Sequence, residues 1–164
     1  MSEQPDDRQP PPLDPMTLPP RTRSNYPVAF RDVVGAREKR QLGAALGLTR
    51  YGVNLVHLPP GAWSSQRHWH SHEDEFVYLL EGELTLITDE GARTLTAGMC
   101  AGFPAGRPDG HHLVNRSDRM AIYLELGDRN EADRVDYPDI DMKLHKENGR
   151  YVFMHKDGSP YPTE

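Results

Sequence analysis

The sequence predicts an all-β protein, a sandwich or barrel, and two observations support this fold class. Apolar residues concentrate between about Tyr51 and Leu126. Within this region they form short runs that are separated by turn signals at regular intervals. The flanking segments are polar and rich in proline. We therefore expect one domain whose core is built from the middle of the chain.

The N-terminal part is expected to contain little regular structure. Residues 1–22 carry repeated prolines, which fix φ and remove backbone donors, and we interpret them as an arm. The arm is either a disordered tail or an extended segment laid on another surface. Residues 23–50 are predicted to be an extension that packs on the barrel. They contain at most one short helix, within 35–47, where Gly47 is placed like a C-cap.

The middle segment, residues 51–127, is predicted to form the barrel from short strands. Turn signals such as Pro59-Pro60-Gly61 and Asp89-Glu90-Gly91 separate these strands, and Glu81-Gly82 joins two of them as a hairpin. The expected strands are 52–58, 76–80, 83–88, 93–95, 99–103, 112–115 and 120–126.

The last segment, residues 128–164, is predicted to be a C-terminal extension with edge strands. Ile140, Met142 and Leu144 alternate with charged residues, and Tyr151–Met154 is a further short apolar run. These strands are expected either to cover the barrel or to pair with a neighbouring subunit.

Composition excludes some classes of partner. The formal net charge is −6, and no basic stripe is visible. We interpret the cluster of Arg37, Lys39 and Arg40 beside Glu38 as a solvated face, so nucleic acid and anionic membranes are not expected partners. The single cysteine, Cys100, is expected to be buried and unreactive. With no signal-peptide pattern at the N-terminus, we expect a cytoplasmic protein.

The segment from Gln66 to Glu75 holds the first candidate metal ligands. Successive side chains of a strand point to opposite faces, so His68 and His70 share one face and Trp69 lies on the other. Glu75 begins the next apolar strand, and a short turn can bring its carboxylate to the same place. Imidazole and carboxylate together suit Fe, Mn, Ni, Co or Zn.

A further histidine comes from a distant strand. His111 would complete a set of three histidines and one glutamate, which leaves coordination positions for other ligands. Its neighbour His112 is the alternative. If His111 points inward, Leu113 and Asn115 do so as well.

These two segments resemble the two motifs of the cupin superfamily. The first motif matches at His68, His70, Glu75 and Gly82, and the second at Gly98, Pro104, Gly106, His111 and Asn115. Two spacings depart from the family pattern. Six residues instead of five follow Gly61, and four instead of two follow Gly106. The resemblance covers roughly residues 50–126 and implies a double-stranded β-helix, or jelly-roll barrel. It also implies one divalent metal ion held by His68, His70, Glu75 and His111.

The resemblance leaves several functions open. We first expect a metal-dependent enzyme that acts on a small molecule, with oxygenase-type chemistry placed first. One alternative is a sugar-phosphate isomerase, in which the metal polarises a carbonyl and a carboxylate moves a proton. That function requires Lys or Arg to hold the phosphate, for which only Arg67 and Arg107 lie near the mouth of the barrel, and Arg67 is expected to point outward. A non-catalytic barrel that binds a small ligand, or a structural protein with an adventitious ion, would also be compatible with the motifs.

No catalytic residue is assigned from the sequence, and neither the substrate nor the metal is identified. A homodimer is expected, because cupins commonly pair through edge strands and the arm and residues 140–154 are suitable elements.

Overall fold

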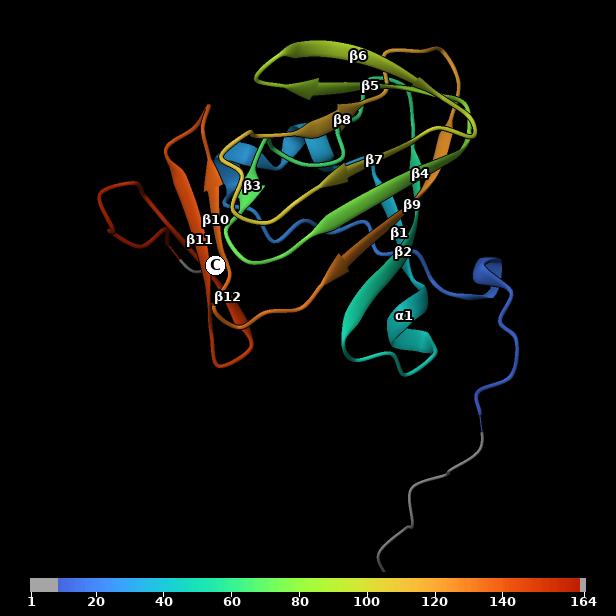
Figure 1. Ribbon diagram of the computed structural model, residues 1–164, viewed down its shortest axis with the longest axis horizontal. Helices are drawn as coiled ribbons and strands as arrows, with labels where there is room; N and C mark the ends of the chain where they lie inside the picture. The colour runs from blue at the N-terminus through green and yellow to red at the C-terminus, as the bar shows by residue number, and fades with distance from the viewer. Residues whose placement is uncertain (1–8, 163–164) are drawn as a thin grey trace, which may run out of the picture.

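The computed structural model describes residues 9–162 and has the jelly-roll architecture that the sequence predicted. A five-stranded antiparallel sheet, in the order β1-β2-β9-β4-β7, faces a three-stranded sheet, β6-β5-β8. A four-stranded sheet, β12-β11-β10-β3, continues the wall (Figure 1). The strands are β1 Glu38–Gln41, β2 Tyr51–Leu58, β3 Trp69–His70, β4 Glu75–Glu81, β5 Glu83–Thr88, β6 Gly91–Thr96, β7 Cys100–Phe103, β8 His112–Val114, β9 Ala121–Asp128, β10 Arg134–Tyr137, β11 Met142–Glu147 and β12 Arg150–Met154. The helices are the 3-10 turns Pro15–Thr17, Val28–Phe30 and Asp32–Val34 and the short α1, Leu42–Ala45.

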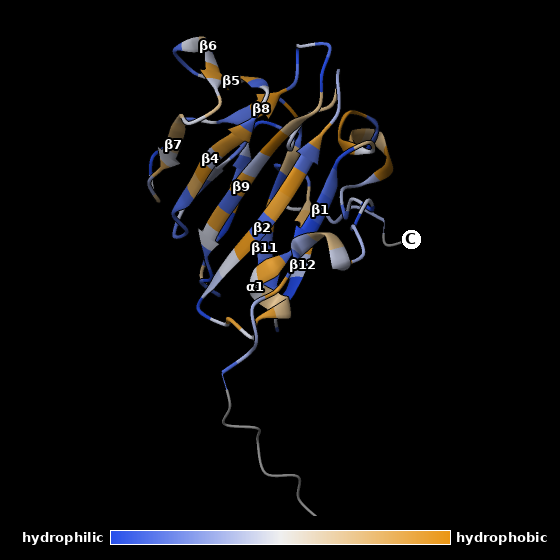
Figure 2. Ribbon diagram, turned by 90° about the vertical axis from the view of Figure 1, so that its right-hand side faces the viewer, coloured by the Kyte–Doolittle hydropathy of each residue, from blue (hydrophilic) through white to orange (hydrophobic). Residues whose placement is uncertain are grey.

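The main core lies between the five-stranded and the three-stranded sheets. On β4, Val77 and Leu79 are buried inside the barrel, whereas Phe76, Tyr78 and Leu80 are exposed on its outer face. Figure 2 shows the hydrophobic residues of β2, β4 and β9 along this sheet. Strand alternation therefore decides which residues of β4 can reach the interior.

A second core joins the two ends of the described chain. Val135, Tyr137, Met142 and Leu144 of β10 and β11 form a buried cluster, against which side chains from both terminal segments pack. Those side chains are Tyr26, Phe30, Ile140, Phe153 and Tyr161. The pairing of β10 with β3 joins the C-terminal strands to the barrel, and β12 lies at the edge of this sheet. Strand β10 itself was not expected from the sequence.

The segment before β2 differs from its predicted helix. Residues 38–41 form β1, which pairs with β2 in the register Lys39 with Val56, and only Leu42–Ala45 are helical. Helix formers were overridden here by strand pairing, since intrinsic propensity is a weak preference. Gly47, at φ +72°, does end this short helix as predicted, and its amide donates to Ala44.

The described part of the N-terminal arm lies on its own chain. Arg21 exchanges two backbone hydrogen bonds with Lys39 of β1, of 2.8 and 3.0 Å. Of the two expectations for the arm, residues 9–22 agree with the extended segment, while residues 1–8 lie outside the described residues.

Three other expectations can be compared with the fold. Cys100 was expected to be buried, but it is exposed on β7 because it follows the alternation of that strand. No helix within residues 9–162 is long and apolar enough to cross a membrane. The homodimer stays a prediction.

The turn between β4 and β5 provides a test of the fold. Gly82 has φ +84°, and a Cβ there would lie 2.8 Å from the Met120 carbonyl oxygen. Gly98 has a similar φ of +90° with open space around it. We expect Gly82→Ala to lower the free energy of unfolding by about 1–3 kcal/mol more than Gly98→Ala, because only Gly82→Ala adds a steric clash. Urea unfolding measures both, and equal losses would contradict this packing.

Candidate metal centre

Backbone pairing brings the two histidine segments together. The amide of His68 donates to the His111 carbonyl at 3.1 Å, and the amide of His111 donates to the His68 carbonyl at 2.8 Å. The two residues are thus directly opposite each other, with their ring centroids 4.9 Å apart. His70 lies on β3, directly after His68, and Glu75 begins β4, so three short segments converge on one point inside the barrel.

Three imidazoles surround one carboxylate oxygen. The Nε2 atoms of His111, His68 and His70 lie 2.8, 3.3 and 3.4 Å from Oε2 of Glu75. Donor atoms that share an ion through bonds of about 2.1 Å lie about 3.0–3.4 Å apart. The spacing therefore fits a single metal ion.

The outer nitrogens of two rings are held in the orientation that a metal site requires. Nδ1 of His68 donates to the Gln66 carbonyl at 2.8 Å, and Nδ1 of His70 donates to Oδ2 of Asp133 at 2.6 Å. With the proton on Nδ1, a neutral ring presents its Nε2 lone pair to the centre. The donor set therefore fits a divalent metal in chemistry as well as in spacing.

The candidate ligands are not equivalent. One ligand atom from each of His68, His70 and Glu75 forms a compact group within 4.8 Å, and His111 is not a member of it. His111 stacks on Phe103 at 3.5 Å, and its Nδ1 has no hydrogen-bond partner among the described residues. The four-ligand set stays a prediction.

The alternative ligand, His112, is engaged elsewhere. Its Nδ1 donates to the Ser65 carbonyl at 3.0 Å, and its ring meets Trp63 edge-on with centroids 4.6 Å apart. Of the two neighbours, only His111 contacts Glu75 in the described structure. This geometry favours His111.

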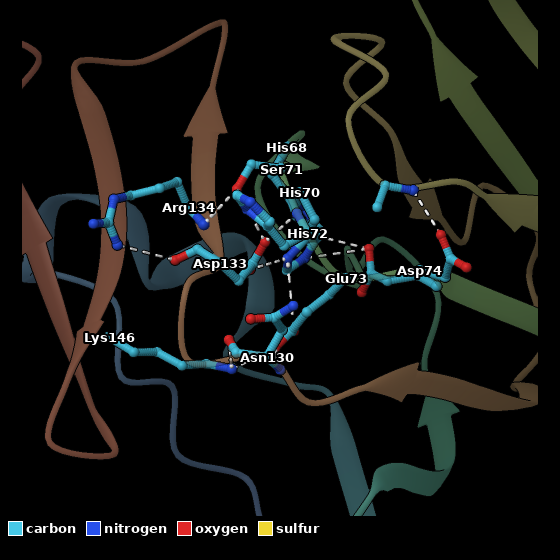
Figure 3. A network of polar contacts seen from close by, with 12 residues as sticks. His68, His70, Ser71, His72, Glu73, Asp74, Asn130, Asp133, Arg134 and Lys146 are labelled. Carbon is cyan, nitrogen blue, oxygen red and sulfur yellow. Dashed lines mark hydrogen bonds and ion pairs between the residues drawn. The ribbon is translucent and has the colours of Figure 1, made fainter.

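Asp133 contacts the candidate site, and its place there was not expected from the sequence. It is 1% exposed, and its carboxylate accepts from His70 and from the backbone amide of His72 (Figure 3). It comes from the turn before β10, more than 60 residues after His70 and His72. No motif links these segments, and only the pairing of β10 with β3 places Asp133 behind His70.

A buried ion pair lies next to Asp133. Glu73 pairs with Lys146 of β11 and accepts from the Asn130 amide at 2.7 Å, as Figure 3 shows. One oxygen of Glu73 lies 3.8 Å from Nδ1 of His70. Lys146 already balances the charge of Glu73. Glu73 can therefore lie beside His70 without a second metal ion.

The burial and contacts of the site residues shift their pKa values. Burial alone would raise the pKa of Glu75, but the surrounding histidines outweigh it and hold the pKa well below its ordinary value. Burial would lower the pKa of His70, yet its hydrogen bond to Asp133 and the nearby carboxylates raise it. For His111 burial prevails, and the pKa is lowered. Glu75 is therefore ionised over the physiological pH range.

A cavity of about 340 Å³ opens onto His68, His70, Glu75 and His111. Its wall includes Glu125 and Tyr123 of β9, Asn54 of β2 and Lys39 of β1. Glu125 accepts a hydrogen bond from Asn54 at 2.9 Å and pairs with Lys39.

The cationic residues of the cavity differ from those expected. Arg37 and Lys39 were interpreted as a solvated face, but both line the cavity, because β1 is the edge strand that closes it. Arg40, the third member of that cluster, is 7% exposed. Arg67 does not line the cavity, since its guanidinium binds Asp89 and Asp139, and neither does Arg107.

Comparison with known proteins identifies the family. The model of the cupin domain matches residues 54–127. A sugar phosphate isomerase of the cupin superfamily from Silicibacter pomeroyi is 43% identical, with a TM-score of 0.88 over 93% of this chain and 97% of that chain. A provisionally named sugar phosphate isomerase from Acidithiobacillus ferrooxidans is 30% identical, with a TM-score of 0.70 over 78% of this chain and 81% of that chain.

More distant structures share the fold alone. A predicted oxalate decarboxylase from Thermotoga maritima is 22% identical, with a TM-score of 0.59 over 72% of this chain and 98% of that chain. No curated protein matches the chain. The barrel fold, the two motifs and the similarity to these proteins agree. The chain therefore belongs to the cupin superfamily.

Proposed function

We propose that this protein is a metal-dependent isomerase that interconverts the aldose and ketose forms of a small phosphorylated sugar. The observation that carries the proposal is Glu125, a second carboxylate that lines the same cavity as the histidines and Glu75. The names of the two relatives with 43% and 30% identity support the same reaction. Oxygenase-type chemistry, which we placed first on sequence alone, has less support.

Glu125 is suited to move a proton. Aldose–ketose isomerisation transfers a proton between two adjacent carbons, which requires a base close to the substrate. One oxygen of Glu125 binds Asn54 and Lys39, which fixes the orientation of the carboxylate. Its side chain is 24% exposed, so a substrate in the cavity can reach it.

The metal would be held by His68, His70, Glu75 and His111. When bound there, a divalent ion supplies Lewis-acid polarisation of the sugar carbonyl, which makes the neighbouring C–H more acidic. The residues of the chain have three roles in this site. Asp133 orients His70, Lys39 holds Glu125 in place, and the residues that line the cavity surround the substrate.

The character of the cavity favours this function over a binding or structural role. A barrel plugged by apolar side chains would favour a non-catalytic or structural protein. Here charged and polar residues of β1, β2 and β9 line a cavity that remains open beside the candidate metal ligands. These residues suit a polar, charged substrate better than an apolar one.

The choice between the two neighbouring histidines is testable by metal analysis. We expect His68→Ala and His111→Ala to lose most bound metal, because each removes a ligand, while His112→Ala retains it. Mass spectrometry of protein purified without a histidine tag gives the stoichiometry. Full occupancy in His111→Ala with loss in His112→Ala would show that His112 is the ligand.

Asp133 provides a second test of the site. Asp133→Asn keeps the size of the side chain but weakens the hydrogen bond that orients His70. We expect metal affinity to fall roughly 10- to 100-fold, the usual effect of removing such a partner. Asp118→Asn is the control, since that side chain is 94% exposed. Equal affinities in a competition titration with a chelator would rule out this role.

Glu125→Gln tests the proposed reaction. We expect kcat for sugar-phosphate isomerisation to fall about 10²- to 10⁴-fold, because the amide cannot accept the proton. Metal content should change little. Exchange of the substrate C–H proton with deuterated water, followed by NMR, should fall in parallel.

The control for that experiment is Glu83→Gln, at an exposed position of β5. Full activity and full exchange in Glu125→Gln would exclude Glu125 as the base. A wild-type protein that isomerises no member of a broad panel of sugar phosphates would contradict the proposed function itself.

A further inference from the structure

Four cationic side chains gather on one wall of the cavity. Arg21 lies directly opposite Lys39 in an antiparallel pair, so their side chains are on the same face of the sheet. Arg23 and Arg37 lie two residues from Arg21 and Lys39 in the sequence, toward the same end of this pair. All four line the cavity that contains the candidate metal ligands.

Carboxylates compensate only part of this charge. Lys39 pairs with Glu125. Arg37 donates to the Ser64 carbonyl, and Arg21 donates to the amide oxygen of Asn25 at 2.7 Å, so neither of these partners carries a charge. The side chain of Arg23 has no hydrogen bond or ion pair within residues 9–162.

This arrangement brings like charges close together. Like charges that lie directly opposite each other across a strand pair destabilise the pairing. Burial also lowers the pKa of Lys39, although the charge of Glu125 opposes this shift. An anion bound between the four groups would offset the repulsion.

We infer that Arg21, Arg23, Arg37 and Lys39 form a binding subsite for a phosphoryl group. Guanidinium groups bind phosphate oxygens through paired, charge-assisted hydrogen bonds, and three of the four residues are arginines. Ser24 and Asn25, which also line the cavity, add polar groups on the same segment. The N-terminal segment is thus a part of the binding site as well as a cover for the barrel.

The subsite defines the substrate class more closely, and in this respect it rests on the proposed function. The phosphoryl end would lie against the N-terminal segment, and the carbonyl end would lie toward Glu75 and the histidines, with Glu125 between. A sugar that carries one phosphate at the end remote from its carbonyl would fit both parts of the cavity.

The test is a binding measurement that needs no turnover. Isothermal titration calorimetry would compare inorganic phosphate, fructose 6-phosphate and unphosphorylated fructose on wild-type protein of measured metal content. The test variant is Arg21→Gln/Arg23→Gln, at two exposed positions. The control, Arg93→Gln/Arg119→Gln, removes the same charge at side chains that are 69% and 87% exposed and outside the cavity.

We expect the test variant to weaken binding of inorganic phosphate and of fructose 6-phosphate by roughly tenfold or more, since two charge-assisted contacts are lost. The control should bind within about twofold of wild type, and added salt should reduce the difference. If the double variant does not fold, Arg23→Gln alone is the substitute, because Arg23 has no partner to lose within the described chain.

Two results would overturn the subsite. One is equal binding of phosphate by the wild-type protein and the test variant. The other is binding that is lost in His68→Ala but kept in the test variant, which would place the phosphate on the metal. Failure of the proposed isomerase function would be distinguishable from both results, because phosphate binding is measured without turnover.

Discussion

The reciprocal backbone hydrogen bonds between His68 and His111 are the contact on which the site depends. They fix two segments, more than 40 residues apart in the chain, in one register, and that register aims both rings at Glu75. A shift by one residue would turn each ring to the other face of its strand. The half-buried carboxylate of Glu75 in turn depends on the imidazoles around it, because a charge that has lost part of its water is costly without close partners.

Sequence patterns could predict this centre because most of its residues lie close together in the chain. The spacing of His68, His70 and Glu75 follows from strand alternation and one short turn, and the apolar runs with their turn signals predicted the barrel. Long-range pairing accounts for what was missed. Asp133 reaches His70 only because β10 pairs with β3, and nothing in the segment around Asp133 distinguishes it from other charged loops.

The error concerning Arg37 and Lys39 has the same physical origin. A short charged run beside a glutamate is most often solvated, and the helix-forming residues around it concealed a strand. Pairing with β2 turns alternate residues of β1 into the cavity, and pairing with Arg21 adds a second segment to the same face. The cavity therefore has two chemical parts: imidazoles and carboxylates from the barrel, and cations from the segment before it. The barrel motifs are common to the superfamily, whereas the cationic wall is built from residues outside the segment that matches the cupin domain.

We infer that one cavity binds a metal ion and, at a separate place, the phosphoryl group of the substrate. The most direct measurement is ³¹P relaxation of fructose 6-phosphate bound to the Mn²⁺-loaded protein. We expect the ion to relax the phosphorus nucleus through space, without direct coordination of phosphate to Mn²⁺. Relaxation no greater than that caused by free Mn²⁺, or phosphate coordinated directly to the bound ion, would contradict it.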